Sequence, residues 1–252
     1  MTKQEDPLTS FIYRLYSLCL ERQPDASGLK YYHDALSSGS MSAADCVRGF
    51  FTSPEMESLG LSDEEYITRC YRVMMDREPD DGGLSYWKDF LENGTSRLYV
   101  VKGFVDSKEF TNICKGYNVT KGTIILEEPR DLNPGVTSFV ARCYTKALGR
   151  QYEVDGLNYH CNRILSAPNK KAMALEVASN GFFHSPEFLN KKLNDEDYIK
   201  TLYRTFLGRE AEADGLKYYS DRLAKGEDRD VLLSNFAESP EFTNIMKSYG
   251  IE

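Results

Sequence analysis

The segment Phe11-Ile12-Tyr13-Arg14-Leu15-Tyr16 decides the fold, because the chain repeats its pattern three more times, starting at Tyr66, Phe139 and Tyr198. Around the first copy, apolar residues stand at positions 11, 12, 15, 16, 19 and 20. Pairs of apolar positions that return at this interval indicate a helix with one buried face. The pattern therefore predicts an α-helix at the start of each of four repeats.

Three further phrases follow each opening segment at fixed distances. An arginine stands six residues after the last tyrosine of the segment, and a Gly-Leu pair begins six residues after the arginine. The arginines are Arg22, Arg77, Arg150 and Arg209, and the glycines are Gly28, Gly83, Gly156 and Gly215. Each copy closes with Phe-x-x-Ser-x-Glu, whose glutamates are Glu55, Glu109, Glu187 and Glu241. Recurrence at fixed spacing indicates tandem structural repeats.

A longer period groups the repeats into two halves. The approaches to repeats one and three are alike, and so are the tails of repeats two and four, Glu109–Lys115 and Glu241–Lys247. We predict a first half over 1–119 with repeats 8–60 and 61–117, a linker over 120–134, and a second half over 135–252 with repeats 135–193 and 194–252. Within the linker, which is rich in Gly, Pro and charge, Thr123–Leu126 is the only strand-like signal.

Each repeat is expected to contain three helices and a short fourth one. The second helix starts near the Gly-Leu pair, and the third follows a loop at Gly39, Gly94 or Gly226. In three closing phrases, Ser-Pro-Glu has the pattern of an N-cap, a proline at N1 and a first-turn acid. Ser62-Asp63-Glu64-Glu65 has the pattern of a capping box. The sequence therefore predicts an all-α fold of four tandem helical repeats arranged as two similar halves.

Composition restricts the partners. The 252 residues carry 39 acidic and 31 basic side chains, a net charge of −8, which disfavours non-specific binding to nucleic acid. No apolar run approaches the roughly 18–20 residues of a membrane span. The start, Met1–Pro7, is polar and lacks the apolar region of a signal peptide. We expect a protein that is either cytoplasmic or trimmed of its leader, and the sequence carries no signal for its oligomeric state.

The cysteines are expected to be free thiols in the core. Cys70 and Cys143 occupy a position that the other copies fill with Leu15 and Leu202, so they behave as small buried hydrophobes. Zinc is disfavoured, because among three histidines only His160 adjoins a cysteine. The six cysteines, none in a CxxC pair, are Cys19, Cys46, Cys70, Cys114, Cys143 and Cys161.

The acidic turn before the Gly-Leu pair of each repeat is the first candidate site. Three residues before the glycines stand Asp25, Asp80, Glu153 and Glu212. Carboxylates are the ligands that calcium prefers. The weak calcium candidates are Asp25, Asp80, Asp81, Asp155 and Asp214. Because each turn offers fewer carboxylates than an EF-hand loop, we favour a structural role, in which the acid caps the second helix and pairs with the arginine of its repeat.

The aromatic pair after each glycine is the second candidate site. The pairs are Tyr31-Tyr32, Tyr86-Trp87, Tyr159-His160 and Tyr218-Tyr219. The second member lies on the apolar face of the helix, so Trp87 is favoured as a core residue, and His160 is the least core-like member of the set. The first member cannot share that face. We favour packing against a neighbouring helix for it, and the alternative is an exposed platform that stacks on sugar rings or on a partner. The ligand-binding candidates are Tyr31, Tyr86, Tyr159, Tyr218 and Trp87.

Catalytic motifs are missing from the sequence. It contains no GxSxG, HExxH, Walker or dinucleotide-binding motif, and no nucleophile with a nearby base. We therefore expect no catalytic residues and, beyond the weak calcium candidates, no cofactor.

The repeat resembles a known bacterial family. Leu207-Gly208-Arg209 with Asp214-Gly215-Leu216, and Arg77 to Trp87 with Phe104 to Phe110, resemble the domain-of-unknown-function family numbered 4214. The resemblance covers all four repeats, and repeat three departs most, with Gln151–Val154 in place of the Pro-Asp turn. The chain also looks distantly like phycobilisome linker domains, which share a helical core and an arginine-centred motif.

The resemblance implies a role at the cell surface. Members of the family are commonly found in secreted or envelope proteins, beside adhesin-like, calcium-binding or carbohydrate-active regions. We therefore expect a non-catalytic binding module for a surface or cell-wall carbohydrate, secreted or at the cell surface, with a cytoplasmic location as the alternative. A protein–protein assembly scaffold is the second hypothesis, and an enzyme with a site between the halves is the weakest.

Overall fold

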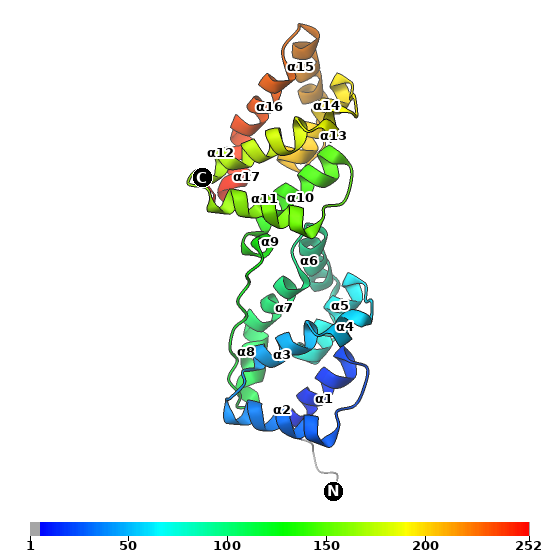
Figure 1. Ribbon diagram of the computed structural model, residues 1–252, viewed down its shortest axis with the longest axis vertical. Helices are drawn as coiled ribbons and strands as arrows, with labels where there is room; N and C mark the ends of the chain where they lie inside the picture. The colour runs from blue at the N-terminus through cyan, green and yellow to red at the C-terminus, as the bar shows by residue number, and fades with distance from the viewer. Residues whose placement is uncertain (1–5, 252) are drawn as a thin grey trace. The chain divides into compact units, whose positions relative to one another are not determined.

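The computed structural model describes residues 6–251, and all regular secondary structure in that range is helical (Figure 1). The predicted all-α repeat fold is therefore confirmed. Residues 1–5 and 252, which the predicted polar start and the predicted halves include, lie outside the described range. The chain forms two compact units that divide between Leu126 and Glu127, and Asn93–Thr95 is grouped with the second unit. This division falls inside the predicted linker.

Unit 1 contains repeats one and two, and each has the expected sequence of three helices and a short or terminal fourth. Repeat one consists of α1 (Pro7–Arg14) continued by η1 (Leu15–Cys19), then α2 (Ala26–Ser38), α3 (Ala43–Phe51) and α4 (Pro54–Ser58). Repeat two consists of α5 (Asp63–Cys70) continued by η2 (Tyr71–Met75), then α6 (Asp81–Glu92), α7 (Arg97–Asp106) and α8 (Lys108–Gly116).

Unit 2 repeats the same order after the short helix α9 (Pro129–Leu132). Repeat three consists of α10 (Pro134–Arg142) with η3 (Cys143–Leu148), α11 (Val154–Ser166), α12 (Lys170–Glu176) with η4 (Val177–Phe183), and α13 (Pro186–Leu189). Repeat four consists of α14 (Asp195–Leu202) with η5 (Tyr203–Leu207), α15 (Ala213–Ala224), α16 (Arg229–Glu238) and α17 (Pro240–Ser248).

The opening helix of every repeat ends in a π-helical turn, where the sequence pattern predicted a continuous α-helix. Its apolar pairs recur every four residues, as at positions 11, 15 and 19. An α-helix turns once per 3.6 residues, so such a stripe drifts around the helix. The wider π-turn brings the later residues back toward the core. Tyr16 and Cys19 in η1 are buried as a result.

Helix starts follow the predicted caps. The Ser62 side chain accepts a hydrogen bond from the Glu65 N–H while the Glu65 side chain accepts one from the Ser62 N–H, so the predicted capping box is present. In the closing phrases, Ser53, Ser185 and Ser239 each cap a short helix whose first residue is proline. Local sequence therefore decides where these helices begin.

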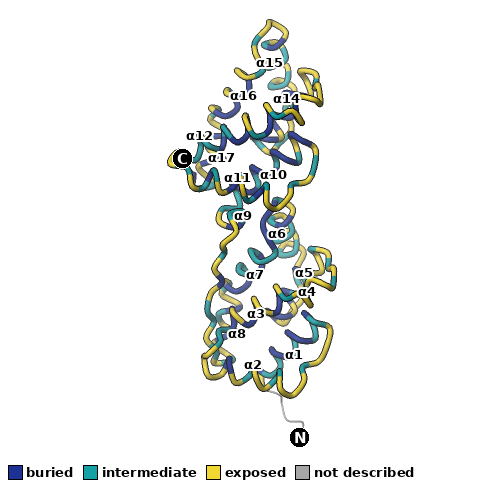
Figure 2. The backbone as a smooth tube through the Cα atoms, in the orientation of Figure 1, coloured by how far each residue is buried: buried dark blue, intermediate teal, exposed yellow. Residues whose placement is uncertain are grey.

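Each unit has its own hydrophobic core. In unit 1, the Phe11 ring on α1 lies 6.4 Å from the Phe110 ring on α8. In unit 2, Phe139 on α10 lies 5.5 Å from Phe242 on α17. The opening helix of the first repeat in each unit thus packs against the last helix of the same unit. Figure 2 shows the buried positions along the inner sides of the helices and the exposed positions at loops and helix ends.

The six cysteines contribute to these cores. All six are buried free thiols, so the prediction of core cysteines is confirmed. Burial raises the pKa of Cys46 and of Cys143 to about 12, so neither thiol is ionised at neutral pH. A buried, protonated thiol is a poor nucleophile and a poor metal ligand.

Thr123–Leu126, the strand-like signal in the linker, has no regular secondary structure, and no strand is present among residues 6–251. Just before it, the carbonyl oxygens of Thr120 and Lys121 accept hydrogen bonds from the N–H groups of Ala43 and Ala44, at 2.9 and 2.8 Å. These N–H groups begin α3 and have no partner within the helix. The first residues of the linker therefore supply hydrogen-bond acceptors for free N–H groups at the N-terminus of α3.

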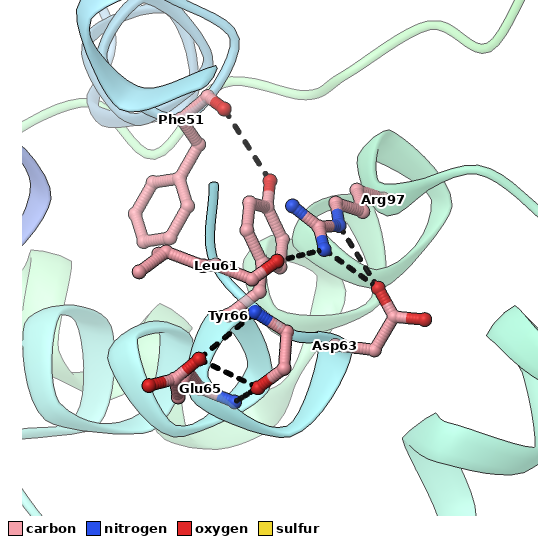
Figure 3. A network of polar contacts seen from close by, with 7 residues as sticks. Phe51, Leu61, Asp63, Glu65, Tyr66 and Arg97 are labelled. Atoms are coloured by element: carbon pink, nitrogen blue, oxygen red, sulfur yellow. Dashed lines mark hydrogen bonds and ion pairs between the residues drawn. The ribbon is translucent and has the colours of Figure 1, made fainter. Parts of the chain in front are cut away.

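Arg97 anchors the third helix of repeat two to the loop before α5 (Figure 3). Its guanidinium donates to the Leu61 carbonyl at 2.6 Å and pairs with Asp63 at 2.8 Å, and it lies over the Tyr66 ring at 4.7 Å. In unit 2, Arg229 makes the corresponding contacts with Leu193, Asp195 and Tyr198. Repeats one and three carry Ala43 and Lys170 at this helix position, so the anchor distinguishes the second repeat of each unit.

The glycine of the Gly-Leu pair leaves room for a tyrosine. A Cβ on Gly28 would lie 2.6 Å from the hydroxyl oxygen of Tyr16, which is closer than any real Cβ contact. The corresponding glycines of the other three repeats face Tyr71, Tyr144 and Tyr203 in the same way. The opening helix and the second helix can approach each other only where this Cβ is missing.

We predict that Gly28→Ala lowers the free energy of unfolding by about 1–3 kcal/mol, because the methyl group forces Tyr16 out of its place. Gly49→Ala is the matched control, since Gly49 lies within α3 and a Cβ there meets nothing within 4 Å. This control should be neutral or stabilising by up to about 1 kcal/mol. Urea unfolding of both variants tests the pair, and equal stabilities would contradict the prediction.

Candidate functional site

The recurring arginine closes each repeat on itself. Arg22 lies over the Tyr16 ring at 4.9 Å, and its Nε and Nη2 donate to the two carboxylate oxygens of Glu55 at 2.7 and 3.3 Å. We call this arrangement the Arg–Tyr–Glu clamp. The other clamps join Arg77 to Tyr71 and Glu109, Arg150 to Tyr144 and Glu187, and Arg209 to Tyr203 and Glu241. The hydrogen bonds from arginine hold the pKa of Glu55, Glu109 and Glu241 below its usual value.

The acidic turn is a weaker partner of the arginine than the sequence suggested. Asp25 and Asp80 accept hydrogen bonds from the N–H groups of Gly28 and Gly83, both at 2.7 Å, as predicted for caps. Glu153 and Glu212 make no capping bond, because the longer side chain does not return to the helix N-terminus. Each lies 3.6 Å from its arginine. The main acidic partner is the closing glutamate, which recurs as regularly as the arginine and was not paired with it from sequence.

The calcium candidates do not gather into a site. Asp25 and Asp80 are engaged as caps, and Asp81, Asp155 and Asp214 lie exposed in the first turns of three separate helices. Within residues 6–251, no three Asp, Glu, His or Cys side chains lie close enough together to hold a metal ion. The geometry therefore gives the calcium interpretation no support.

The first tyrosine of each aromatic pair is exposed, so the favoured interpretation of packing was wrong. Tyr31, Tyr86, Tyr159 and Tyr218 are 58, 56, 61 and 57% exposed. Each lies on the outer side of the second helix of its repeat. Each of these rings contacts the ring of the next residue in the sequence, at 4.9–5.1 Å in an edge-to-face arrangement.

The second aromatic residue packs against the core, as the sequence predicted. Trp87 is half-buried and stacks on Phe104 at 5.3 Å with an interplanar angle of 28°. Gly103 beside it lacks a side chain, and a Cβ there would collide with the indole ring. Trp87 therefore contacts both Phe104 of the core and the exposed Tyr86.

A polar residue accompanies each exposed tyrosine, and sequence reasoning missed it. Three residues after the tyrosines stand Asp34, Asp89, Asn162 and Asp221, all exposed. Residues three apart on a helix are neighbours on one face. In unit 2, Arg163 and Arg222 also lie near the tyrosine rings, at 5.8 and 5.4 Å. The signal was present in the sequence as an Asp or Asn at a constant distance from the tyrosine.

The exposed carboxyl groups of the clamps and caps do not have the character of a general acid. Those of Asp25, Glu55, Glu65, Glu109 and Glu241 have a lowered pKa, because hydrogen bonds from basic, hydroxyl or backbone groups stabilise the anion. A general acid at neutral pH needs the opposite shift.

His160 takes the place of Trp87 in repeat three. Its ring lies 5.0 Å from the Phe182 ring and 6.2 Å from the Tyr144 ring, and its Nδ1 is buried with no hydrogen-bond partner among residues 6–251. Burial, together with the charge of Arg163, lowers its pKa to about 4. The imidazole is therefore neutral at neutral pH and serves as an aromatic packing residue.

We expect unit 2 to lose stability on mild acidification because of His160. Its pKa in the folded state lies below the unfolded value of about 6.5, so the unfolded chain takes up the proton first and stability falls as the pH drops below that value. His160→Trp should remove this loss between pH 7 and pH 5. Gly181 faces His160 as Gly103 faces Trp87.

Thermal melts of wild type and His160→Trp across that window check the prediction. Trp87→His in unit 1 is the reciprocal variant and should introduce the same sensitivity. Identical pH profiles of wild type and His160→Trp would show that His160 does not titrate differently on folding.

The fold and its repeated clamp define a tandem helical-repeat protein. The chain belongs to the family described as "Domain of unknown function (DUF4214)", whose model matches residues 4–60, 57–114 and 178–246. The unmatched stretch contains most of repeat three, where His160 and the altered turn depart from the other copies. No curated protein and no solved structure matches the chain. No helix within residues 6–251 has the length and apolar character needed to cross a bilayer.

Proposed function

We propose that this chain is a non-catalytic carbohydrate-binding module, in which each repeat presents one tyrosine as a stacking surface for a sugar ring. The observation that carries the proposal is the exposure of the same tyrosine in all four repeats, at a position where packing does not require an aromatic residue. A single exposed aromatic side chain is ordinary on a protein surface. Four in equivalent positions, each supported by a second ring, favour a shared use.

The neighbouring polar groups suit a sugar. The apolar C–H face of a pyranose packs against an aromatic ring, while its hydroxyl groups need hydrogen-bond partners at the edge of that ring. Asp34, Asp89, Asn162 and Asp221 supply carboxylate or amide groups next to the tyrosines. Arg163 and Arg222 add donors in unit 2. This combination of a flat apolar surface and a polar rim is typical of small-ligand sites, although here the surface is open.

The energetics favour a polymeric ligand. A contact between aromatic groups contributes about 0.5–1.5 kcal/mol beyond the area it buries, so one tyrosine binds weakly. Several weak sites on one chain gain about 10²–10⁴-fold when a single ligand engages more than one of them. A polysaccharide repeats its sugar units and can do this. A surface or cell-wall polysaccharide is therefore the ligand class that we propose, with a cell-surface location for the protein.

The proposal predicts that the purified chain binds a defined set of polysaccharides on a glycan array, and that the fourfold variant Tyr31→Ser, Tyr86→Ser, Tyr159→Ser, Tyr218→Ser loses at least about 90% of that signal, since every site loses its stacking contact. The array is read with and without calcium.

A second fourfold variant is the matched control. Ile125→Ser, Leu132→Ser, Leu189→Ser and Val231→Ser remove side chains of similar exposure that do not recur between repeats. This variant should keep the wild-type binding, and melting curves should show that both variants fold. Absence of any bound glycan, or equal binding by the tyrosine variant, would refute the proposal.

A further inference from the structure

In each unit, a pocket lies between the opening segments of the two repeats. In unit 1 the pocket has a volume of about 290 Å³ and is lined by Arg14, Leu18, Arg72, Asp76, Arg77 and Glu78. In unit 2 it has a volume of about 440 Å³ and is lined by Arg142, Lys146, Arg204, Gly208, Arg209 and Glu210, with Thr145. The residues correspond one by one, so the two pockets are the same site in two copies and can be compared directly.

In the unit 1 pocket, the charge of the arginine side chains is balanced by neighbouring carboxylates. The Arg14 guanidinium donates to the Val73 carbonyl at 3.2 Å, to Asp76 at 3.3 Å and to the Tyr117 hydroxyl at 3.0 Å. All three of its nitrogens therefore have partners, and one of these partners is a carboxylate. Leu18 adds an apolar wall. The other two arginines of the lining are also paired, Arg72 with Glu78 and Arg77 with Glu109.

Two replacements change the charge of the unit 2 pocket. Gly208 stands where unit 1 has Asp76, and Lys146 stands where unit 1 has Leu18. The lining therefore contains four basic side chains and one acidic side chain in unit 2, against three and two in unit 1. A positive pocket of this kind stands out in a chain whose net charge is −8.

Arg142 and Lys146 are the cations that remain available. Arg204 and Arg209 already pair with Glu210 and Glu241, both with oxygens within 2.8 Å. Arg142 donates to the Thr205 carbonyl at 3.0 Å and to the Ser138 hydroxyl at 2.9 Å. Within residues 6–251, neither Arg142 nor Lys146 forms an ion pair with a carboxylate. Arg142 is half-buried, so its charge is less screened than that of a surface arginine.

We propose that the unit 2 pocket binds an oxyanion, a phosphate or sulfate group, through Arg142 and Lys146. The Thr205 and Ser138 contacts hold the guanidinium in position, which reduces the entropy lost on binding. Arginine presents its N–H groups as a planar fork that matches tetrahedral oxyanions, and lysine contributes a compact charge. A volume of about 440 Å³ accommodates such a group together with part of the molecule that carries it.

Gly208, which stands where unit 1 has Asp76, provides a direct test of the proposal. Gly208→Asp should place a carboxylate beside Arg142, as Asp76 does beside Arg14. The substitution is compatible with the backbone, because Asp76 adopts a φ of 54° and Gly208 one of 68°. An added Cβ would lie 3.6 Å from Arg142 Nε, an ordinary van der Waals distance.

The experiment is an NMR titration of the full chain with sodium phosphate and with sodium sulfate, at constant ionic strength set with sodium chloride. We expect saturable shifts at unit 2 pocket residues for at least one of the two anions, and the preferred anion identifies the source of the group. Gly208→Asp and Lys146→Leu should each weaken binding at least about tenfold. The reciprocal unit 1 variant, Asp76→Gly with Leu18→Lys, should gain a second site.

The titration can refute the proposal. Shifts that match those of chloride alone, or unchanged affinity in both Gly208→Asp and Lys146→Leu, would overturn it. Melting curves confirm that each variant is folded, and Arg142→Gln replaces Gly208→Asp if the latter does not fold. The result does not depend on carbohydrate binding by the tyrosines, because inorganic anions are the probes and the tyrosine variant should bind them as wild type does.

Discussion

The Arg–Tyr–Glu clamp is the interaction on which the repeat depends. It joins the opening helix, which supplies the tyrosine, to the helix that begins within the closing phrase and supplies the glutamate. Both charged groups are partly exposed, so the ion pair alone contributes little to stability. The clamp matters because it fixes geometry. The planar guanidinium binds the carboxylate of the closing glutamate and lies on the tyrosine ring, which restricts how the two helices can be arranged. The glycine opposite the tyrosine hydroxyl completes the junction.

This arrangement explains why most of the recurring residues report folding. The arginines, closing glutamates, opening tyrosines and glycines of all four copies are engaged in the same junction. What remains recurrent and has no packing role is the exposed tyrosine on the second helix, with its polar neighbour three residues later. The carbohydrate proposal rests on these residues, because the packing of the repeat does not account for their recurrence.

Differences between equivalent positions carry a second kind of information. The two units share a fold and a pocket, yet Asp76 and Leu18 in one correspond to Gly208 and Lys146 in the other. Leu18 is partly buried against the unit 1 core, whereas Lys146 is exposed. Both exchanges raise the charge of one pocket, and together they leave Arg142 without the carboxylate that satisfies Arg14. Because the chain is duplicated, each unit can be compared with the other to identify the positions that have diverged.

The sequence by itself determined the all-α class, the four repeats, the helix starts and the burial of the cysteines, because these follow from periodicity and from caps that act within a few residues. It could not place Tyr31 and its counterparts at the surface, since a position off the apolar face can still meet a neighbouring helix. It also missed the pairing of Arg22 with Glu55 and the pocket at Arg142. These contacts join residues more than thirty positions apart, and only the packing of helices in three dimensions decides which distant side chains meet.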